Sequence, residues 1–183
     1  MSLLRHLYLS YFSKPAGERF LYRGLPKWSC RRIVELGVGD GGRVRRLLEQ
    51  ASRNAGGEKI RYTGIDLFES RPADRPGLTL KHAHQRLQFP EARIQLAPGD
   101  PWMVLSRLAN TLLDTDLLLV HADQDAESMR RAWFYMPRML HGQSRVFVER
   151  STDKGPVYDG LSLEQVRAFA EQAQRLERAG RAA

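Results

Sequence analysis

The sequence has a single cysteine, very few lysines and no long hydrophobic run. Cys30 alone cannot form an internal disulfide, which excludes a disulfide-stapled fold and is typical of a reducing compartment. No apolar run approaches the ~18 residues that a membrane-spanning helix requires, and no small-residue cleavage site follows the apolar residues at the N-terminus. We therefore expect a soluble, cytoplasmic protein with no membrane partner.

Length and composition indicate one ordinary globular domain. The chain has 183 residues, of which 42% are hydrophobic and 27% charged. This balance excludes wholesale disorder. A chain of this length buries about 70% of its unfolded surface without metal or disulfide support.

The charge is strongly basic, with a net value of +8 and an isoelectric point of about 10.1. Such a field attracts anions, which makes nucleic acid a partner to consider. However, 24 of the 29 basic residues are arginines, and they are scattered with no run of five or six together. The sequence therefore does not favour a nucleic-acid partner.

Short apolar runs alternate with amphipathic segments along most of the chain. This alternation predicts an α/β fold with a doubly wound, mostly parallel sheet and helices on both faces. An N-terminal helical segment, broken at Pro15 and Gly17 and closed by Gly24 and Pro26, should precede it. The predicted strands are 32–36, 61–66, 93–96, 116–120 and 146–149, and the predicted helices are 42–53, 78–88, 101–113, 125–140 and 162–179.

The first strand ends in a glycine-rich turn. Glu35, Gly37, Gly39 and Gly41 form the pattern E-x-G-x-G-x-G, in which glycines allow a tight turn and a close ligand approach. The pattern also contains G-x-G-x-x-G, a weak dinucleotide signal, and a turn without a ligand is a further alternative. Because an acid beside a pyrophosphate would add like charge, Glu35 fits better opposite an amino group.

Polar residues also follow the next three strands, where ligands bind in open parallel sheets. Asp66 is placed to accept the hydroxyls of a ribose or to cap a turn. Asp100 is placed to accept the amine of an adenine, or to cap the helix that Pro101 opens. His121 and Asp123 lie on one side of an extended segment, and Asp125 follows as a helix cap.

Together these positions resemble the class I methyltransferases that use S-adenosylmethionine, over residues 32–150. The resemblance implies that Glu35 helps to hold the methionine amine, that Gly37, Gly39 and Gly41 line the cofactor, and that Asp66 binds the ribose. It further implies that Leu67 flanks the adenine, with Asp100 and Pro101 beside it. The stretch 116–125 is most similar to the small-molecule O-methyltransferase branch.

The chain departs from that branch in two places. His121 stands where the branch has a metal-binding aspartate, and Glu149-Arg150-Ser151 replaces an aspartate–asparagine pair, so we expect no metal site. Only 33 residues follow Arg150, and most have a helical pattern. We therefore expect a sheet of order 3-2-1-4-5 without the antiparallel pair usual in the family. The domain would comprise a helical extension (1–31), a core (32–150) and a C-terminal helix (151–183).

Without that pair, the strand 145–149 would be an exposed edge. Cover by the tail or pairing with a second molecule would satisfy its backbone groups, and the sequence favours a homodimer. A Phe147→Lys substitution should then shift the dimer toward monomer.

The function expected from these observations is methyl transfer from S-adenosylmethionine to a small-molecule acceptor, through an oxygen nucleophile. His121 is the candidate base, because its ordinary pKa is near neutral, and Asp123 would orient it. The alternatives are an RNA methyltransferase, a relative that binds the cofactor without catalysis, and a dehydrogenase of the same fold class.

Overall fold

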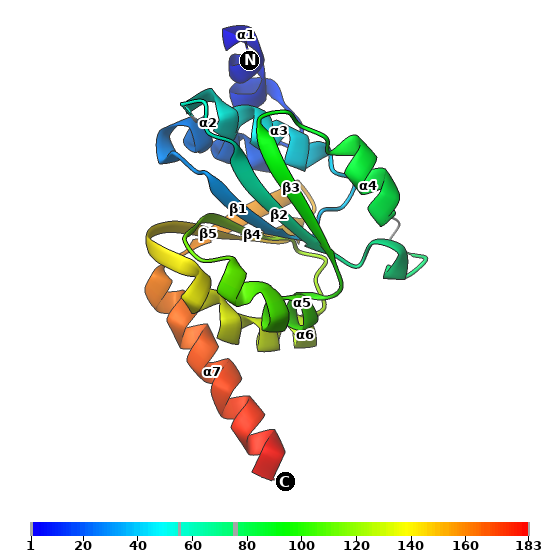
Figure 1. The fold of residues 1–183 in the computed structure, drawn as a ribbon, viewed down its shortest axis with the longest axis vertical. Coiled ribbons are helices and arrows are strands. Elements are labelled where there is room, and N and C mark those ends of the chain that lie inside the picture. The colour runs from blue at the N-terminus through cyan, green and yellow to red at the C-terminus, as the bar shows by residue number, and fades with distance from the viewer. Residues whose placement is uncertain (1, 55, 75–76, 183) are drawn as a thin grey trace.

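The structure of the chain is a computed structural model, which describes residues 2–54, 56–74 and 77–182. Its centre is a six-stranded sheet of order 3-2-1-4-5-6 (Figure 1), in which only β6 runs antiparallel to its neighbour. The strands are β1 (Arg32–Leu36), β2 (Ile60–Asp66), β3 (Ala92–Pro98), β4 (Thr115–Val120), β5 (Leu140–Thr152) and β6 (Gly155–Leu161).

Helices cover both faces of the sheet (Figure 1). One face packs against α2, α3 and α4, and the other against α5, α6 and α7. The helices are α1 (Leu3–Leu7), α2 (Arg19–Trp28), α3 (Gly42–Ala51), α4 (Leu80–Arg86), α5 (Pro101–Leu108), α6 (Ala126–Ala132) and α7 (Leu163–Ala182). Short helical turns are η1 (Tyr8–Phe12), η2 (Ala16–Glu18), η3 (Ser52–Asn54), η4 (Phe68–Ser70), η5 (Ala109–Thr111) and η6 (Trp133–Met139).

Residues of the central strands are buried alternately on the two faces. Ile33 and Leu117 pack toward α2 and α3, whereas Val34 and Leu118 pack toward α5 and α6. This two-sided burial explains why the strands read as continuous apolar runs. It confirms the predicted doubly wound α/β fold and the strand order 3-2-1-4-5 for its first five strands.

The helical spacing of apolar residues in the sequence matches the buried side of α3 and only part of that of α7. In α3 the apolar side, which includes Val44 and Leu47, is fully buried. In α7, Val166 and Ala173 are buried, but Phe169 is 38% exposed and Leu176 is 41% exposed. A helix of 20 residues is about 30 Å long, so α7 extends beyond the layer that it covers (Figure 1).

The prediction that nothing extends the sheet beyond the fifth strand is wrong. Residues 155–161, expected to lead into a helix, form β6, which pairs antiparallel with β5 from Val146 opposite Leu161 to Thr152 opposite Gly155. Gly155 has a φ of +105° and lets the chain reverse after Thr152. The strand 145–149 is therefore paired on both sides and is not an edge.

The aromatic side chain proposed for a dimer contact is instead packed within the chain. The ring of Phe147 lies 4.9 Å from that of Phe20 and 5.6 Å from that of Trp28, both on α2. The turn η2 lies against β6, where Gly17 packs directly on the Pro156 carbonyl. The N-terminal segment therefore packs over the part of the sheet that was expected to be exposed.

The N-terminal helix also continues past the residues expected to end it. α2 runs through Gly24 and Pro26 and ends at Trp28, after which Ser29 adopts a left-handed conformation. At Gly24, a Cβ atom would lie 2.0 Å from the Trp28 ring, so glycine makes room for that ring four residues later. Gly24 therefore does not end the helix. Its missing side chain allows the Trp28 ring to pack against the helix backbone.

Candidate functional site

A pocket of about 410 Å³ opens beyond the carboxyl ends of β2, β3 and β4. This is the edge at which parallel α/β sheets bind ligands. Among the residues predicted for the site, Asp66, Leu67, Asp100, Pro101 and Asp123 line it together. The full lining consists of Asp66, Leu67, Arg71, Pro72, Asp74, Asp100, Pro101, Asp123, Gln124 and Asp125.

The three glycines after β1 differ in what surrounds them. A Cβ atom at Gly37 would lie 2.5 Å from the Cβ of His121, and one at Gly41 would contact Leu87. Gly39, with a φ of +61°, has open space where a side chain would be. Gly37 therefore permits packing against the end of β4, and Gly39 has an open Cβ position, but none of the three glycines is among the residues that line the pocket.

Asp66 holds the glycine turn in place and is itself held by an arginine. Its Oδ2 accepts hydrogen bonds from the amides of Val38 (2.7 Å) and Gly39 (3.0 Å). Arg71 donates to both carboxylate oxygens at 2.7 Å. Burial alone would raise the pKa of Asp66, but the hydrogen bonds from Arg71 and Gly39 outweigh it and lower the pKa. Asp66 is therefore an ionised anchor of the pocket.

Arg71 also reaches the end of β4. Its Nη1 donates to Oδ2 of Asp123 at 2.8 Å, so that one guanidinium joins the carboxylates that follow β2 and β4. The nearby His121 ring and Arg71 lower the pKa of Asp123, although burial opposes them. The sequence offered no signal for Arg71, because it lies in a polar loop with no periodicity.

Asp100 combines the two roles that the sequence left open. Its Oδ1 caps α5 by accepting from the Met103 amide at 3.1 Å, and it also accepts from the Ser128 hydroxyl. Within the described residues, no hydrogen bond to its Oδ2 is present. Asp100 therefore caps the helix and still presents one carboxylate oxygen at the pocket. Asp125 caps α6 through the Ser128 amide, as predicted.

His121 lies behind the pocket rather than in its lining. Its Nδ1 is 3.1 Å from Oδ1 of Asp123, although the contact is poorly aligned for a hydrogen bond, and its Nε2 is 3.4 Å from Oε2 of Glu149. The side chain is 27% exposed. The imidazole therefore lies between two carboxylates and remains partly open to solvent.

Glu35 is fully buried beneath the glycine turn and does not line the pocket. Its carboxylate accepts from the Arg43 guanidinium at 2.6 Å and from the Tyr62 hydroxyl at 2.5 Å. Burial and the adjacent Glu35 charge raise the pKa of Tyr62 far above its usual value, so Tyr62 remains a donor. The sequence predicted that Glu35 faces the amino group of a ligand. In the structure it faces the guanidinium of Arg43 instead.

Arg43 connects Glu35 to the far strands of the sheet. Its Nη2 donates to the Gly37 carbonyl at 3.0 Å, and its Nη1 donates to Glu149 at 2.9 Å and to the Tyr158 hydroxyl at 2.7 Å. The sequence gives no sign of the role of Arg43, because an arginine on an amphipathic helix is usually solvated and its burial depends on the tertiary structure. β6, which supplies Tyr158, was missed as well.

The described ranges contain no group of three or more histidine, cysteine or acidic side chains arranged to hold a metal ion. Cys30 is buried, and burial raises the pKa of its thiol to about 12. A reactive thiolate at this position is therefore disfavoured.

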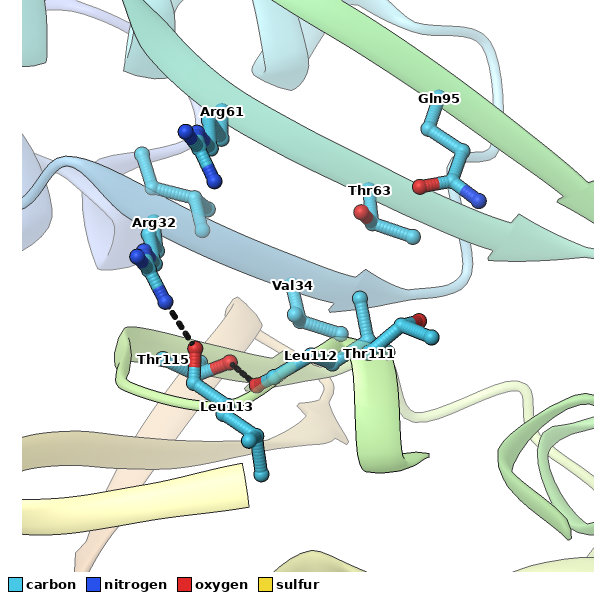
Figure 2. A pocket seen from close by; sticks show the side chains of 10 residues that line it. Arg32, Val34, Arg61, Thr63, Gln95, Thr111, Leu112, Leu113 and Thr115 are labelled. Carbon is cyan, nitrogen blue, oxygen red and sulfur yellow. Dashed lines mark hydrogen bonds between the residues drawn. The ribbon is translucent and has the colours of Figure 1, made fainter. Parts of the chain in front are cut away.

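A second, smaller hollow of about 150 Å³ lies toward the amino ends of the strands (Figure 2). Arg32 bonds the Leu113 carbonyl at its rim, and Thr63 and Gln95 face the hollow from β2 and β3. The loops that follow the parallel strands do not converge at this end. We therefore place the functional site at the carboxyl-end pocket.

Comparison with known proteins identifies the fold. No family model and no curated protein matches the sequence. The O-methyltransferase TomG from Streptomyces achromogenes, solved in complex with SAM, is 15% identical with a TM-score of 0.53, covering 93% of this chain and 78% of TomG. A TehB-like SAM-dependent methyltransferase from Corynebacterium glutamicum is 19% identical with a TM-score of 0.50, covering 91% and 77%.

A SAM-dependent methyltransferase from Archaeoglobus fulgidus is similar to the same extent, with 14% identity, a TM-score of 0.50, and coverage of 91% of this chain and 71% of that one. At these identities the similarity is one of fold. The chain therefore has the fold of the class I SAM-dependent methyltransferases.

Proposed function

We propose that the carboxyl-end pocket binds S-adenosylmethionine and that the chain transfers its methyl group to an oxygen of a small molecule. The observation that carries the proposal is the charge of the pocket. Its lining contains five aspartates, Asp66, Asp74, Asp100, Asp123 and Asp125, and one cation, Arg71. A dinucleotide pyrophosphate would meet like charge there, whereas a sulfonium cation meets opposite charge.

The residues of the pocket offer the chemical groups that would hold an adenosine group. Asp100 offers its Oδ2 to an adenine amine, with Leu67 and Pro101 as apolar neighbours. Gly39 leaves room for close approach of the ligand to the turn. Asp66 would accept the ribose hydroxyls once Arg71 has withdrawn from it, since its two oxygens are already occupied.

At the methionine end, the contribution that we assign to Glu35 is indirect. Its carboxylate is saturated by Arg43 and Tyr62, and Arg43 in turn holds the Gly37 carbonyl. Glu35 thus holds the turn of Gly37, Gly39 and Gly41 in shape for the ligand. Bound S-adenosylmethionine supplies a methyl group activated by its sulfonium, and the protein positions the acceptor.

His121 is the base in this proposal. Asp123, 3.1 Å from Nδ1, would orient the imidazole once the two groups align for a hydrogen bond, while Glu149 near the other nitrogen is already bound by Arg43 and Tyr158. Nε2 is therefore the nitrogen that takes the acceptor's hydroxyl proton. His121→Gln should slow methyl transfer to hydroxylated small molecules by about 10²–10⁴-fold without weakening the binding of S-adenosylhomocysteine.

Calorimetry of the purified protein tests the binding step. S-Adenosylmethionine and S-adenosylhomocysteine should bind with dissociation constants on the order of micromolar, which is about −8 kcal/mol. NAD should bind far more weakly. Tighter binding of NAD than of S-adenosylhomocysteine would overturn the proposal.

Asp100→Asn is the sharpest variant, because asparagine still caps α5 but loses the second carboxylate oxygen. We expect it to weaken S-adenosylhomocysteine binding about tenfold, the usual effect of an unpaired polar group. Asp153→Asn removes the same charge from an exposed site outside the pocket and should leave the affinity unchanged.

The occupied state of Asp66 favours one second candidate, a protein that binds the nucleoside without transferring a methyl group. The Arg71–Asp66 pair would then be the resting arrangement that a ligand leaves intact. A single-turnover assay with methyl-labelled S-adenosylmethionine and a panel of hydroxylated acceptors separates the two, because only the enzyme releases S-adenosylhomocysteine.

A further inference from the structure

The N-terminal helical segment turns its apolar side outward. Leu4 is 78% exposed and Phe12 is 68% exposed, and the other members of this side are also exposed. We call this surface the N-terminal face; it consists of Leu3, Leu4, Leu7, Tyr8, Tyr11 and Phe12. These six account for more than half of the exposed large hydrophobic residues identified in the described chain. A surface helix normally shows the reverse pattern.

The inner side of the same segment places polar side chains beside one buried leucine, Leu9. His6 makes a 2.6 Å contact from Nδ1 to Oε1 of Gln50 on α3, and the Ser13 hydroxyl donates to the Leu9 carbonyl at 2.6 Å. Ser10 and Ser13 are buried. His6 thus bonds the body of the protein and Leu9 packs into the core, while the six apolar side chains of the N-terminal face are left in solvent. A contiguous exposed apolar patch of this kind marks an interaction surface.

The surroundings of the N-terminal face are basic. Residues 1–34 contain seven lysines or arginines and a single acid, Glu18. Glu18 is buried and bonded to Tyr22 and Arg46, so its charge is compensated internally. Residues 1–34 therefore carry +6 of the chain's net charge of +8. Three of the seven cations, Arg5, Arg31 and Arg32, form ion pairs with acids outside this segment, whereas no ion pair is described for Lys14, Arg23 or Lys27.

Exposed cations border the apolar side chains directly. The Arg5 guanidinium lies 6.0 Å from the Tyr8 ring, and that of Arg23 lies 5.7 Å from the Tyr11 ring. Lys14 follows the segment, and Lys27 lies one turn beyond Arg23 on α2. An apolar face with aromatic residues and a basic border is the pattern of helices that lie on anionic membranes.

We propose that the N-terminal face, with Arg5, Lys14, Arg23 and Lys27 around it, docks on an anionic lipid surface. A second copy of the chain is a poorer partner, because its own cations would face the same cations of this copy. Nucleic acid is a poorer partner as well, because it would leave the exposed leucines in water. A lipid surface offers both an apolar interior and negative charge. The described residues include no helix long and apolar enough to cross a bilayer, so the contact is with one surface only.

This inference differs from the sequence-based expectation of no membrane partner, which considered only spanning segments. It is independent of the proposed methyl transfer. The N-terminal face lies at the opposite end of the molecule from the end of α7 (Figure 1).

Co-sedimentation of the full chain with vesicles tests the proposal. The protein should bind vesicles of phosphatidylcholine mixed with phosphatidylglycerol, bind phosphatidylcholine alone weakly, and lose binding as salt rises. Leu4→Glu and Phe12→Glu should each weaken binding about tenfold or more, because each removes an apolar side chain that would enter the lipid on binding. Both side chains are exposed, so the variants should fold normally.

Matched controls lie on other elements. Leu176→Glu replaces a 41% exposed leucine on α7 and should leave vesicle binding unchanged. Arg23→Gln/Lys27→Gln should reduce binding to the mixed vesicles, whereas Arg107→Gln/Arg175→Gln, with the same change in net charge, should not. Absence of binding to the mixed vesicles at low salt would overturn the proposal. A dimer in solution that Phe12→Glu dissociates would assign the face to a second copy instead.

Discussion

Arg71 joins Asp66 and Asp123 at the centre of the pocket, although nothing in its local sequence distinguishes it. Replacing it by alanine leaves the largely buried Asp66 carboxylate with only amide donors, which should cost about 2 kcal/mol of folding stability. The same change frees Asp66 for a ribose, so binding of S-adenosylhomocysteine should strengthen. Urea unfolding and calorimetry measure the two effects. Weaker binding by the variant would show that Arg71 contributes to the ligand site.

The acidity of Asp66 and Asp123 determines how stability depends on pH. Both carboxyls have folded-state pKa values below the ordinary 3.8, so the folded state favours their ionised forms. Their contribution is fully present above about pH 4 to 5 and is lost as pH falls through the lowered folded-state values. The free energy of unfolding should therefore fall on acidification below about pH 4, and it should fall less in Asp66→Asn. An identical acid response in the variant would contradict this.

At the scale of secondary-structure elements, the contact between η2 and β6 tolerates no side chain. A Cβ atom at Gly17 would lie 1.8 Å from the Pro156 carbonyl oxygen, and both groups are backbone. Gly17→Ala should destabilise the protein by about 2 kcal/mol, since overpacking forces the two segments apart. Gly142→Ala is the control, because open space surrounds that position, and it should change stability by less than about 0.5 kcal/mol. Thermal unfolding of the two variants gives the comparison.

The additional strand β6 changes the expected effect of a substitution at Phe147. Its ring projects from β5 onto the aromatic rings of Phe20 and Trp28 on α2, so Phe147→Lys places a charge in an apolar contact. We now expect a loss of about 3 kcal/mol in unfolding free energy rather than dissociation of a dimer. Sedimentation velocity alongside urea unfolding checks this expectation. A folded variant with unchanged stability would indicate that the ring is dispensable.

At the scale of the whole molecule, charge is separated into two regions of opposite sign. The carboxyl-end pocket is acidic, whereas residues 1–34, with seven lysines or arginines and one acid, carry +6 of the net charge of +8. Exposed charges further apart than about 8–10 Å are largely screened at physiological salt. Arg23→Gln/Lys27→Gln should therefore change the affinity for S-adenosylhomocysteine less than about twofold, while vesicle binding falls. A parallel loss of S-adenosylhomocysteine affinity and vesicle binding would show that the two regions are coupled.

The sequence by itself determined the α/β class, the first five strands and the polar residues that follow each of those strands. Apolar strands buried on both faces produce runs that are readable without any structure, and glycines and aspartates directly follow those strands. Short-range patterns such as the cap at Asp125 and the buried face of α3 were also correct. In each of these cases the physical cause lies within a few neighbouring residues.

Only the tertiary structure decided what those strand ends contact. Arg43 and Arg71 reach their carboxylates across separate elements, and Tyr158 arrives from a strand that has no long apolar run. The spacing of apolar residues in 3–12 predicts a helix. Which side of that helix is buried depends on α3, because Gln50 on α3 bonds His6 and so turns the His6 side toward the protein. Helical periodicity identifies an apolar side, whereas the partner that packs against the helix determines which side is buried.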